Sequence, residues 1–203
     1  MEKSNLQYVE PEVSLIKFKK EIGDFHNIRN VWREKGVFLI YESFPVVEFV
    51  FTTPKLHPSA IAFSVRIDFT NYDIEPPSLK FICPFTGRIL TRQEIPVQFL
   101  QVKFPEKMDT NIPIQIQQQD LLQASSPNEI PFFCIPGIKE YHDHPAHTGD
   151  AWLLHRKRGE GGLGFILDQL YNHSITCISS YQISYNIGFA QTIQIPKIPT
   201  PIK

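Results

Sequence analysis

The stretch IAFSVRIDF, residues 61–69, decides the fold, because its apolar and polar residues alternate without a break. One set comprises Ile61, Phe63, Val65, Ile67 and Phe69, and the other comprises Ala62, Ser64, Arg66 and Asp68. Successive side chains of a β-strand point to opposite faces. The alternation therefore predicts a strand of an antiparallel sheet that is covered on one side only.

A long amphipathic helix is expected before this strand, over roughly residues 12–35. Its apolar side chains recur at steps of three and four, which places them along one helical face. They are Leu15, Phe18, Ile22, Phe25, Ile28 and Trp32. Gly23 interrupts the pattern. Gly36 is expected to end the helix, because glycine readily adopts the conformation of a C-terminal cap.

Short β-rich runs lie on both sides of the central strand. Residues 37–41 and 46–52 predict a hairpin, and residues 78–83 predict a further strand. Together with residues 61–69, these runs make an antiparallel meander of about four strands. The apolar spacing of residues 163–172 predicts a second helix near the C-terminus. The expected fold class is therefore α+β.

Three weaker patterns follow the meander. Residues 97–104 predict another strand, residues 120–124 a short helical turn, and residues 152–155 a short strand. Residues 175–195 alternate loosely and suggest a strand or an extended segment. Residues 196–203 are rich in proline, which predicts a polyproline-like tail.

Composition narrows the function classes. Lys and Arg number 20 against 21 Asp and Glu, a net charge of −1, so no overall field favours nucleic acid or an anionic membrane surface. Three scattered cysteines, Cys83, Cys134 and Cys177, form no disulfide framework and fit a reducing cytoplasm. No run approaches the roughly 20 apolar residues needed to cross a bilayer, and no leader sequence is recognisable. We expect a cytoplasmic protein that binds neither nucleic acid nor membrane.

The segment 134–147 is the candidate site. It contains Cys134, Glu140, His142 and His144, and thiolate, carboxylate and imidazole are the side chains that bind zinc. The acid and the two histidines alternate, so an extended backbone would point them to one side. The alternative is a polar loop in which Cys134 is a small buried hydrophobic residue. The histidine spacing from His142 to His147 also matches the metallo-β-lactamase motif, but an alanine replaces that motif's aspartate.

A resemblance appears at Tyr72-Asp-Ile-Glu-Pro76-Pro77-Ser-Leu79-Lys-Phe81. This segment resembles the Tyr-Pro-x-x-Pro-Pro-x-Val-x-Phe motif of ubiquitin-conjugating enzymes, and the preceding helix and strands fit that UBC-like fold. The stretch from His144 to Gly149 is similar to a degenerate His-Pro-Asn motif of the same family. The catalytic cysteine then falls at Trp152, and an indole cannot form a thioester. The resemblance therefore implies the fold without its transfer chemistry, unless Cys134 or Cys83 supplies the thiol.

The candidate ligands carry a second resemblance, best over residues 133–170. Cys134, Glu140, His142 and His144 resemble the signature of the predicted metal-binding CEHH family. Members of that family are encoded beside bacterial ubiquitin-like proteins and their enzymes. The resemblance implies a zinc-binding accessory protein of such a pathway, including pathways used against phage. Its implied partners are a ubiquitin-like protein or its activating and conjugating enzymes.

Two chemistries follow from this ligand set. Four protein ligands would close a structural zinc site, which leaves no position for a substrate. If Glu140 instead stands away from the metal, it could act as general base in a zinc-dependent hydrolase or ligase-like enzyme. His147 and Asp150 are expected to orient the ligand histidines from behind. The chain length of 203 residues predicts one domain, over residues 1–195, and the conjugating-enzyme resemblance implies an insertion at about 88–130.

Overall fold

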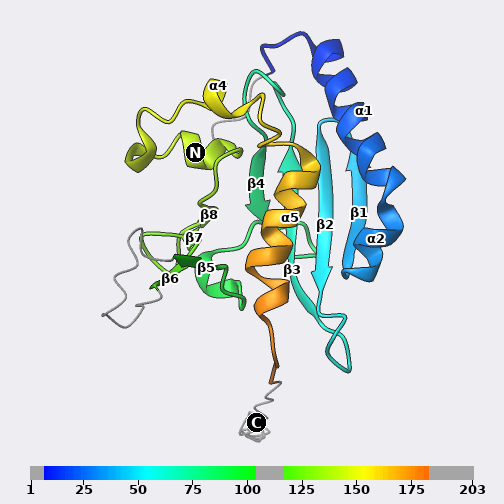
Figure 1. Ribbon diagram of the computed structural model, residues 1–203, viewed down its shortest axis with the longest axis vertical. Coiled ribbons are helices and arrows are strands. Elements are labelled where there is room, and N and C mark those ends of the chain that lie inside the picture. Colours follow the sequence, from blue (N-terminus) through cyan, green and yellow to red (C-terminus); the bar gives the residue numbers. More distant parts are fainter. Residues whose placement is uncertain (1–6, 104–116, 183–203) are drawn as a thin grey trace, which may run out of the picture.

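The computed structural model describes residues 7–103 and 117–182, in which an N-terminal and a C-terminal helix lie against a four-stranded antiparallel sheet (Figure 1). The expected α+β class, with an N-terminal helix, a four-strand meander and a C-terminal helix, is confirmed. The strands are β1 (Val37–Ser43), β2 (Val46–Thr52), β3 (Ile61–Asp68) and β4 (Ser78–Phe81). Each strand pairs with its neighbour in sequence, so β1 and β4 are the two edges of the sheet.

The alternation in β3 sorts the sheet into two faces. Cross-strand neighbours on the apolar face are Phe49, Val65 and Phe81, and all three are buried. Cross-strand neighbours on the other face are Glu48, Arg66 and Lys80. The polar face therefore carries charged residues at the same level of three adjacent strands.

Helices cover the apolar face. The sheet packs against α1 (Pro11–Asn27), which buries Phe18, Ile22 and Phe25, and α5 (Leu163–His173), which buries Leu163, Ile166, Leu167 and Leu170. Figure 1 shows α1 and α5 against the same side of the sheet. A carboxylate joins the two helices: Oε2 of Glu21 in α1 accepts a hydrogen bond from the first N–H of α5, on Leu163, at 2.8 Å. This bond satisfies one of the unpaired N–H groups at the start of α5.

The expected N-terminal helix is two helices. The chain leaves α1 at Ile28, whose φ is −118°, and α2 (Arg29–Glu34) follows. The interruption expected at Gly23 was wrong, since this glycine lies inside α1. The expected end at Gly36 is confirmed, and its φ of 81° is the left-handed conformation that favours glycine.

Two small hairpins follow the sheet. They pair β5 (Leu100–Lys103) with β6 (Gln117–Asp120) and β7 (Leu122–Gln123) with β8 (Phe132–Phe133), after a short turn η1 (Arg92–Glu94). The helical turn expected at 120–124 was wrong. The Asp120 carboxylate accepts hydrogen bonds from the N–H groups of Phe99 and Leu122, at 3.1 and 2.9 Å, and these bonds support the passage from β6 to β7.

The remaining chain forms short helical turns before and after α5. They are α3 (Lys139–His142), η2 (Pro145–His147), α4 (Trp152–His155) and η3 (Ile175–Cys177). The strand expected at 152–155 was wrong, because Trp152 and His155 point inward at a helical spacing of three. The expected tail and most of the alternating pattern before it lie outside the described residues, as does part of the 88–130 segment. Within the described ranges, no helix combines the length and apolar content that a bilayer crossing needs.

Candidate functional site

The segment that carries the predicted ligands is helical where an extended chain was expected. Residues Lys139–His142 form the single turn α3. Each residue of an α-helix advances by roughly 100°, so side chains two positions apart point toward opposite sides. Glu140 and His142 therefore diverge, and the alternation that suggested a shared face does not apply.

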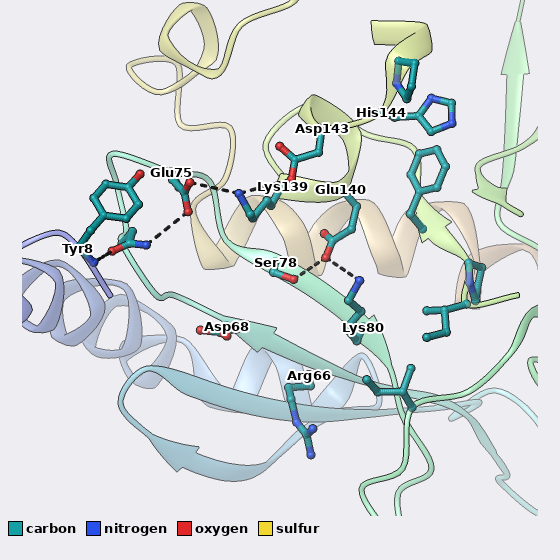
Figure 2. A pocket seen from close by; sticks show the side chains of 16 residues that line it. Tyr8, Arg66, Asp68, Glu75, Ser78, Lys80, Lys139, Glu140, Asp143 and His144 are labelled. Carbon is teal, nitrogen blue, oxygen red and sulfur yellow. Dashed lines mark hydrogen bonds and ion pairs between the residues drawn. The ribbon is translucent and has the colours of Figure 1, made fainter. Parts of the chain in front are cut away.

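Glu140 lies against the edge strand β4 (Figure 2). Its carboxylate accepts a hydrogen bond from the Ser78 hydroxyl and another, at 3.0 Å, from the N–H of Leu79. Lys80 forms an ion pair with the same carboxylate at 3.0 Å. The Glu140 side chain is only 14% exposed. Both of its oxygens are thus occupied by partners from one strand.

This carboxylate stands in an open cleft of about 1140 Å³ on the polar side of the sheet (Figure 2). The cleft has a charged end with Tyr8, Glu75, Lys139 and Asp143, and an apolar end with Ile89, Ile130, Pro131 and Phe132. Lys139 is paired with Glu75 at 3.2 Å and with Asp143 at 3.4 Å. The cleft therefore carries charges of both signs, and its lysines form ion pairs with carboxylates that also line it.

A thiol and an imidazole face each other beyond α3. Sγ of Cys134 lies 3.3 Å from Nε2 of His147. The His147 ring stacks on Tyr141 with 3.9 Å between ring centroids. Burial, followed by the nearby imidazole of His144, lowers the pKa of His147. The neutral imidazole that results can accept a proton or bind a metal ion.

His144 lines the cleft. Its ring stacks on Phe132 with 4.8 Å between centroids, and its Nδ1 accepts a hydrogen bond from the N–H of Ala146 at 3.3 Å. The centroids of the His144 and His147 rings are 5.8 Å apart. The bond at Nδ1 leaves Nε2 as the protonated nitrogen of a neutral His144 ring.

Asp150 organises the other side of the segment. Its carboxylate accepts a hydrogen bond from the Tyr141 hydroxyl at 2.7 Å and contacts Nε2 of His155 at 2.5 Å. Its backbone carbonyl accepts a hydrogen bond from Nδ1 of His142 at 2.8 Å. His155 also contacts Glu160 through its other nitrogen. One residue therefore orients a tyrosine and two histidines.

The pKa values in this network follow from its hydrogen bonds. The bond to Asp150, opposed by desolvation and helped by Glu160, raises the pKa of His155. The bonds from His155 and Tyr141 lower the pKa of Asp150. Burial, and then the bond to Asp150, raises the pKa of Tyr141 to about 12. The His155 ring is thus held between two carboxylates, which favour its charged form.

The four predicted ligands do not meet at one point. Over residues 7–103 and 117–182, no group of three or more His, Cys, Asp and Glu side chains is arranged to hold a metal ion. Cys134 approaches His147, whereas Glu140 binds β4. Sequence reasoning placed His147 behind the ligands and missed Ser78 and Lys80. Those two residues alternate on β4, but no pattern in the sequence connects them with a residue some 60 positions away.

Trp152 occupies the position at which the conjugating-enzyme resemblance places a catalytic cysteine. Its side chain is buried, and its indole N–H donates a hydrogen bond to the carbonyl of Asp73 at 3.0 Å. The ring packs directly over the backbone of Gly161, where a Cβ atom would collide with it. Trp152 therefore fastens the segment to the turn before β4.

Comparison with known proteins identifies a matching family and a similar protein. A model of the Y4jH family matches residues 9–178. The uncharacterised protein y4jH of Sinorhizobium fredii (strain NBRC 101917 / NGR234) is 42% identical over 196 residues. That match covers 94% of this chain and 90% of the relative.

Proposed function

This chain belongs to the Y4jH family, and we propose that it is a non-catalytic accessory protein, an adaptor or scaffold, of a bacterial ubiquitin-like conjugation pathway that acts in defence against phage. The observation that carries the non-catalytic part is the state of Trp152. A thioester-forming side chain must reach a bulky protein substrate, whereas Trp152 is buried and hydrogen-bonded to Asp73. Trp152 therefore has a structural role.

The proposal includes a zinc ion near Cys134. Thiolate sulfur and imidazole nitrogen are ligands that zinc favours, and Cys134 and His147 already face each other at 3.3 Å. His142 has its tautomer fixed by the carbonyl of Asp150, as ligand histidines commonly have. Cys134 and His147 would hold the ion, together with His142 or His144 after a local shift. The ion would brace the segment 134–147.

Glu140 has a different place in this scheme than the sequence suggested. Its oxygens are bound to Ser78, Leu79 and Lys80, so most acceptor positions of this carboxylate are already taken by the sheet. The hydrolase alternative with Glu140 as general base therefore receives no support from the geometry. Its contacts with β4 give the carboxylate a structural role.

A second candidate function rests on the same thiol–imidazole pair. A cysteine within hydrogen-bond reach of a histidine with a lowered pKa is the arrangement of a nucleophile and its general base. In that case His147 would take the proton of Cys134, the sulfur would attack a substrate carbonyl, and the leaving group would depart with that proton, so the chain would be an acyl-transfer enzyme. The two candidates make opposite predictions for the reactivity of Cys134.

Iodoacetamide labelling of each cysteine, measured by mass spectrometry with and without a chelator, separates them. If zinc is bound, metal analysis finds one ion per chain, and Cys134 labels only after chelation or in His147→Ala. If Cys134 is a nucleophile, it labels quickly without chelator, and His147→Ala slows it. Cys177→Ser is the matched control, because this exposed thiol lies elsewhere. Absence of stoichiometric metal together with ordinary thiol reactivity contradicts both.

The pathway assignment needs its own experiment. Purified ubiquitin-like protein from the same genome, its activating enzyme and ATP are mixed with this chain. We expect binding by calorimetry but no reductant-sensitive adduct on any cysteine. Failure to bind either protein would remove the pathway assignment and leave the zinc result standing.

A further inference from the structure

The two edge strands of the sheet differ in whether their outward-facing backbone groups are hydrogen-bonded. At β4, the carboxylate of Glu140 accepts the outward N–H of Leu79, and the N–H of Lys139 donates to the carbonyl of Pro77 at 2.9 Å. The N–H of Leu90 reaches the carbonyl of Phe81, also at 2.9 Å. This edge is closed by the protein's own groups.

The edge strand β1 (Val37–Ser43) is not closed. Within residues 7–103 and 117–182, its backbone groups make no backbone hydrogen bond outside the ladder with β2. Side chains along it are apolar and exposed: Phe38, Ile40 and Tyr41 are 38%, 47% and 49% exposed. An unpaired, apolar edge strand is a template for pairing with another chain.

Proteins usually protect such an edge with lysine, proline or a bulge. Val37–Ser43 contains neither lysine nor proline, and the ladder has a bulge between Leu39 and Tyr41. The bulge twists the strand but covers none of it. The neighbouring helix α2, which contacts β1, also exposes apolar side chains: Val31 on it and Ile28 before it are 51% and 48% exposed.

We infer that β1 is the interface of a homodimer, in which it pairs antiparallel with β1 of a second copy across a two-fold axis. Charge favours this occupant. Antiparallel self-pairing brings the start of one strand beside the end of the other, so the end of α2 that carries Arg33 would lie on the side of Glu42 of the second copy. In the described chain Arg33 has no ion-pair partner, and the Glu42 carboxylate pairs with His26. Because β4 is closed, pairing stops at two chains and cannot propagate into a fibre.

The interface must bury more than the strand itself. A stable dimer commonly buries about 800 Å² per partner, more than a seven-residue strand provides alone. The exposed apolar residues of α2 and β1 supply the additional area. The inference is independent of the proposed function, since it uses neither the cysteine nor the histidines.

Sedimentation velocity and light scattering over a range of concentrations test it. We expect twice the chain mass of 23.5 kDa for the native protein and the single-chain mass for Ile40→Lys and Tyr41→Lys. Phe85→Lys is the control, because Phe85 is 85% exposed on a distant turn and should leave the dimer intact. Circular dichroism checks that each variant is folded.

Three results would overturn the inference. One is a native protein that is monomeric at every concentration. Another is a dimer that survives both β1 substitutions, which would place the contact on a different surface. Open-ended polymers of the native chain would show that a second edge is also available for pairing.

Discussion

At the scale of single residues, Glu140 has the clearest structural role in the candidate site. Its carboxylate is the one group that occupies the outward N–H of Leu79 on β4. The same carboxylate takes the Ser78 hydroxyl and the Lys80 ammonium. Three donors of β4 converge on this mostly buried carboxylate, so Glu140 holds α3 against the sheet.

Glu140→Ala should lower the free energy of unfolding by about 1–3 kcal/mol, because it leaves a partly buried backbone N–H without an acceptor. Urea unfolding measures the loss, and hydrogen exchange at the Leu79 amide should become faster. Asp143→Ala is the matched control on the same turn, since that carboxylate is 64% exposed. Equal losses of unfolding free energy in the two variants would argue against a stabilising contact between Glu140 and β4.

At the scale of elements, the segment between β8 and α5 is held to the rest of the protein by a few specific contacts. Trp152 is hydrogen-bonded to Asp73, and Arg156 pairs with the same residue at 3.4 Å. Gly161, with a φ of 80°, lies against the Trp152 ring and the carbonyl of Gly137. The close approach of backbone and indole requires the absence of a Cβ atom.

Gly161→Ala should therefore destabilise the protein more than Gly159→Ala, although both glycines have positive φ. Gly159 has open space around it, so its replacement costs only the conformational term of about 1–2 kcal/mol. Gly161→Ala adds a collision with Trp152, worth about 1–3 kcal/mol more. Thermal unfolding followed by tryptophan fluorescence gives the difference. Matching midpoints would mean that the indole moves aside.

At the scale of the whole molecule, aromatic rings join the two halves of the chain. Phe99 is fully buried and lies 5.0 Å from Phe63, 5.2 Å from Phe81 and 5.2 Å from Phe133, centroid to centroid. The first two rings belong to the sheet and the third to the hairpin that leads into the candidate site. The sheet and the site segment therefore share one core.

Phe99→Ala should cost about 3–5 kcal/mol, the usual range for an aromatic residue deleted from a core. Sheet and site segment should still unfold in a single transition, observed by far-ultraviolet circular dichroism and tryptophan fluorescence together. Phe85→Ala, at an exposed position, should change stability by no more than about 0.5 kcal/mol. Separate transitions in the native protein would contradict a shared core.

The sequence by itself determined the sheet and its covering helices. Period-two alternation in β3 and three-to-four spacing in α1 and α5 are local patterns, because the side chains that share a face are close in sequence. The helix end at Gly36 was likewise predictable, because glycine adopts positive φ readily. Composition identified the ligand-bearing segment but not its geometry.

Only the tertiary structure decided what the site residues contact. Glu140 meets Ser78 and Lys80 across some 60 residues, and the helical turn at α3 separates it from His142, where an extended chain would have aligned them. Cys134 instead meets His147. Short turns are set by packing against the sheet more than by local preference, so their residues carry little signal of their own conformation.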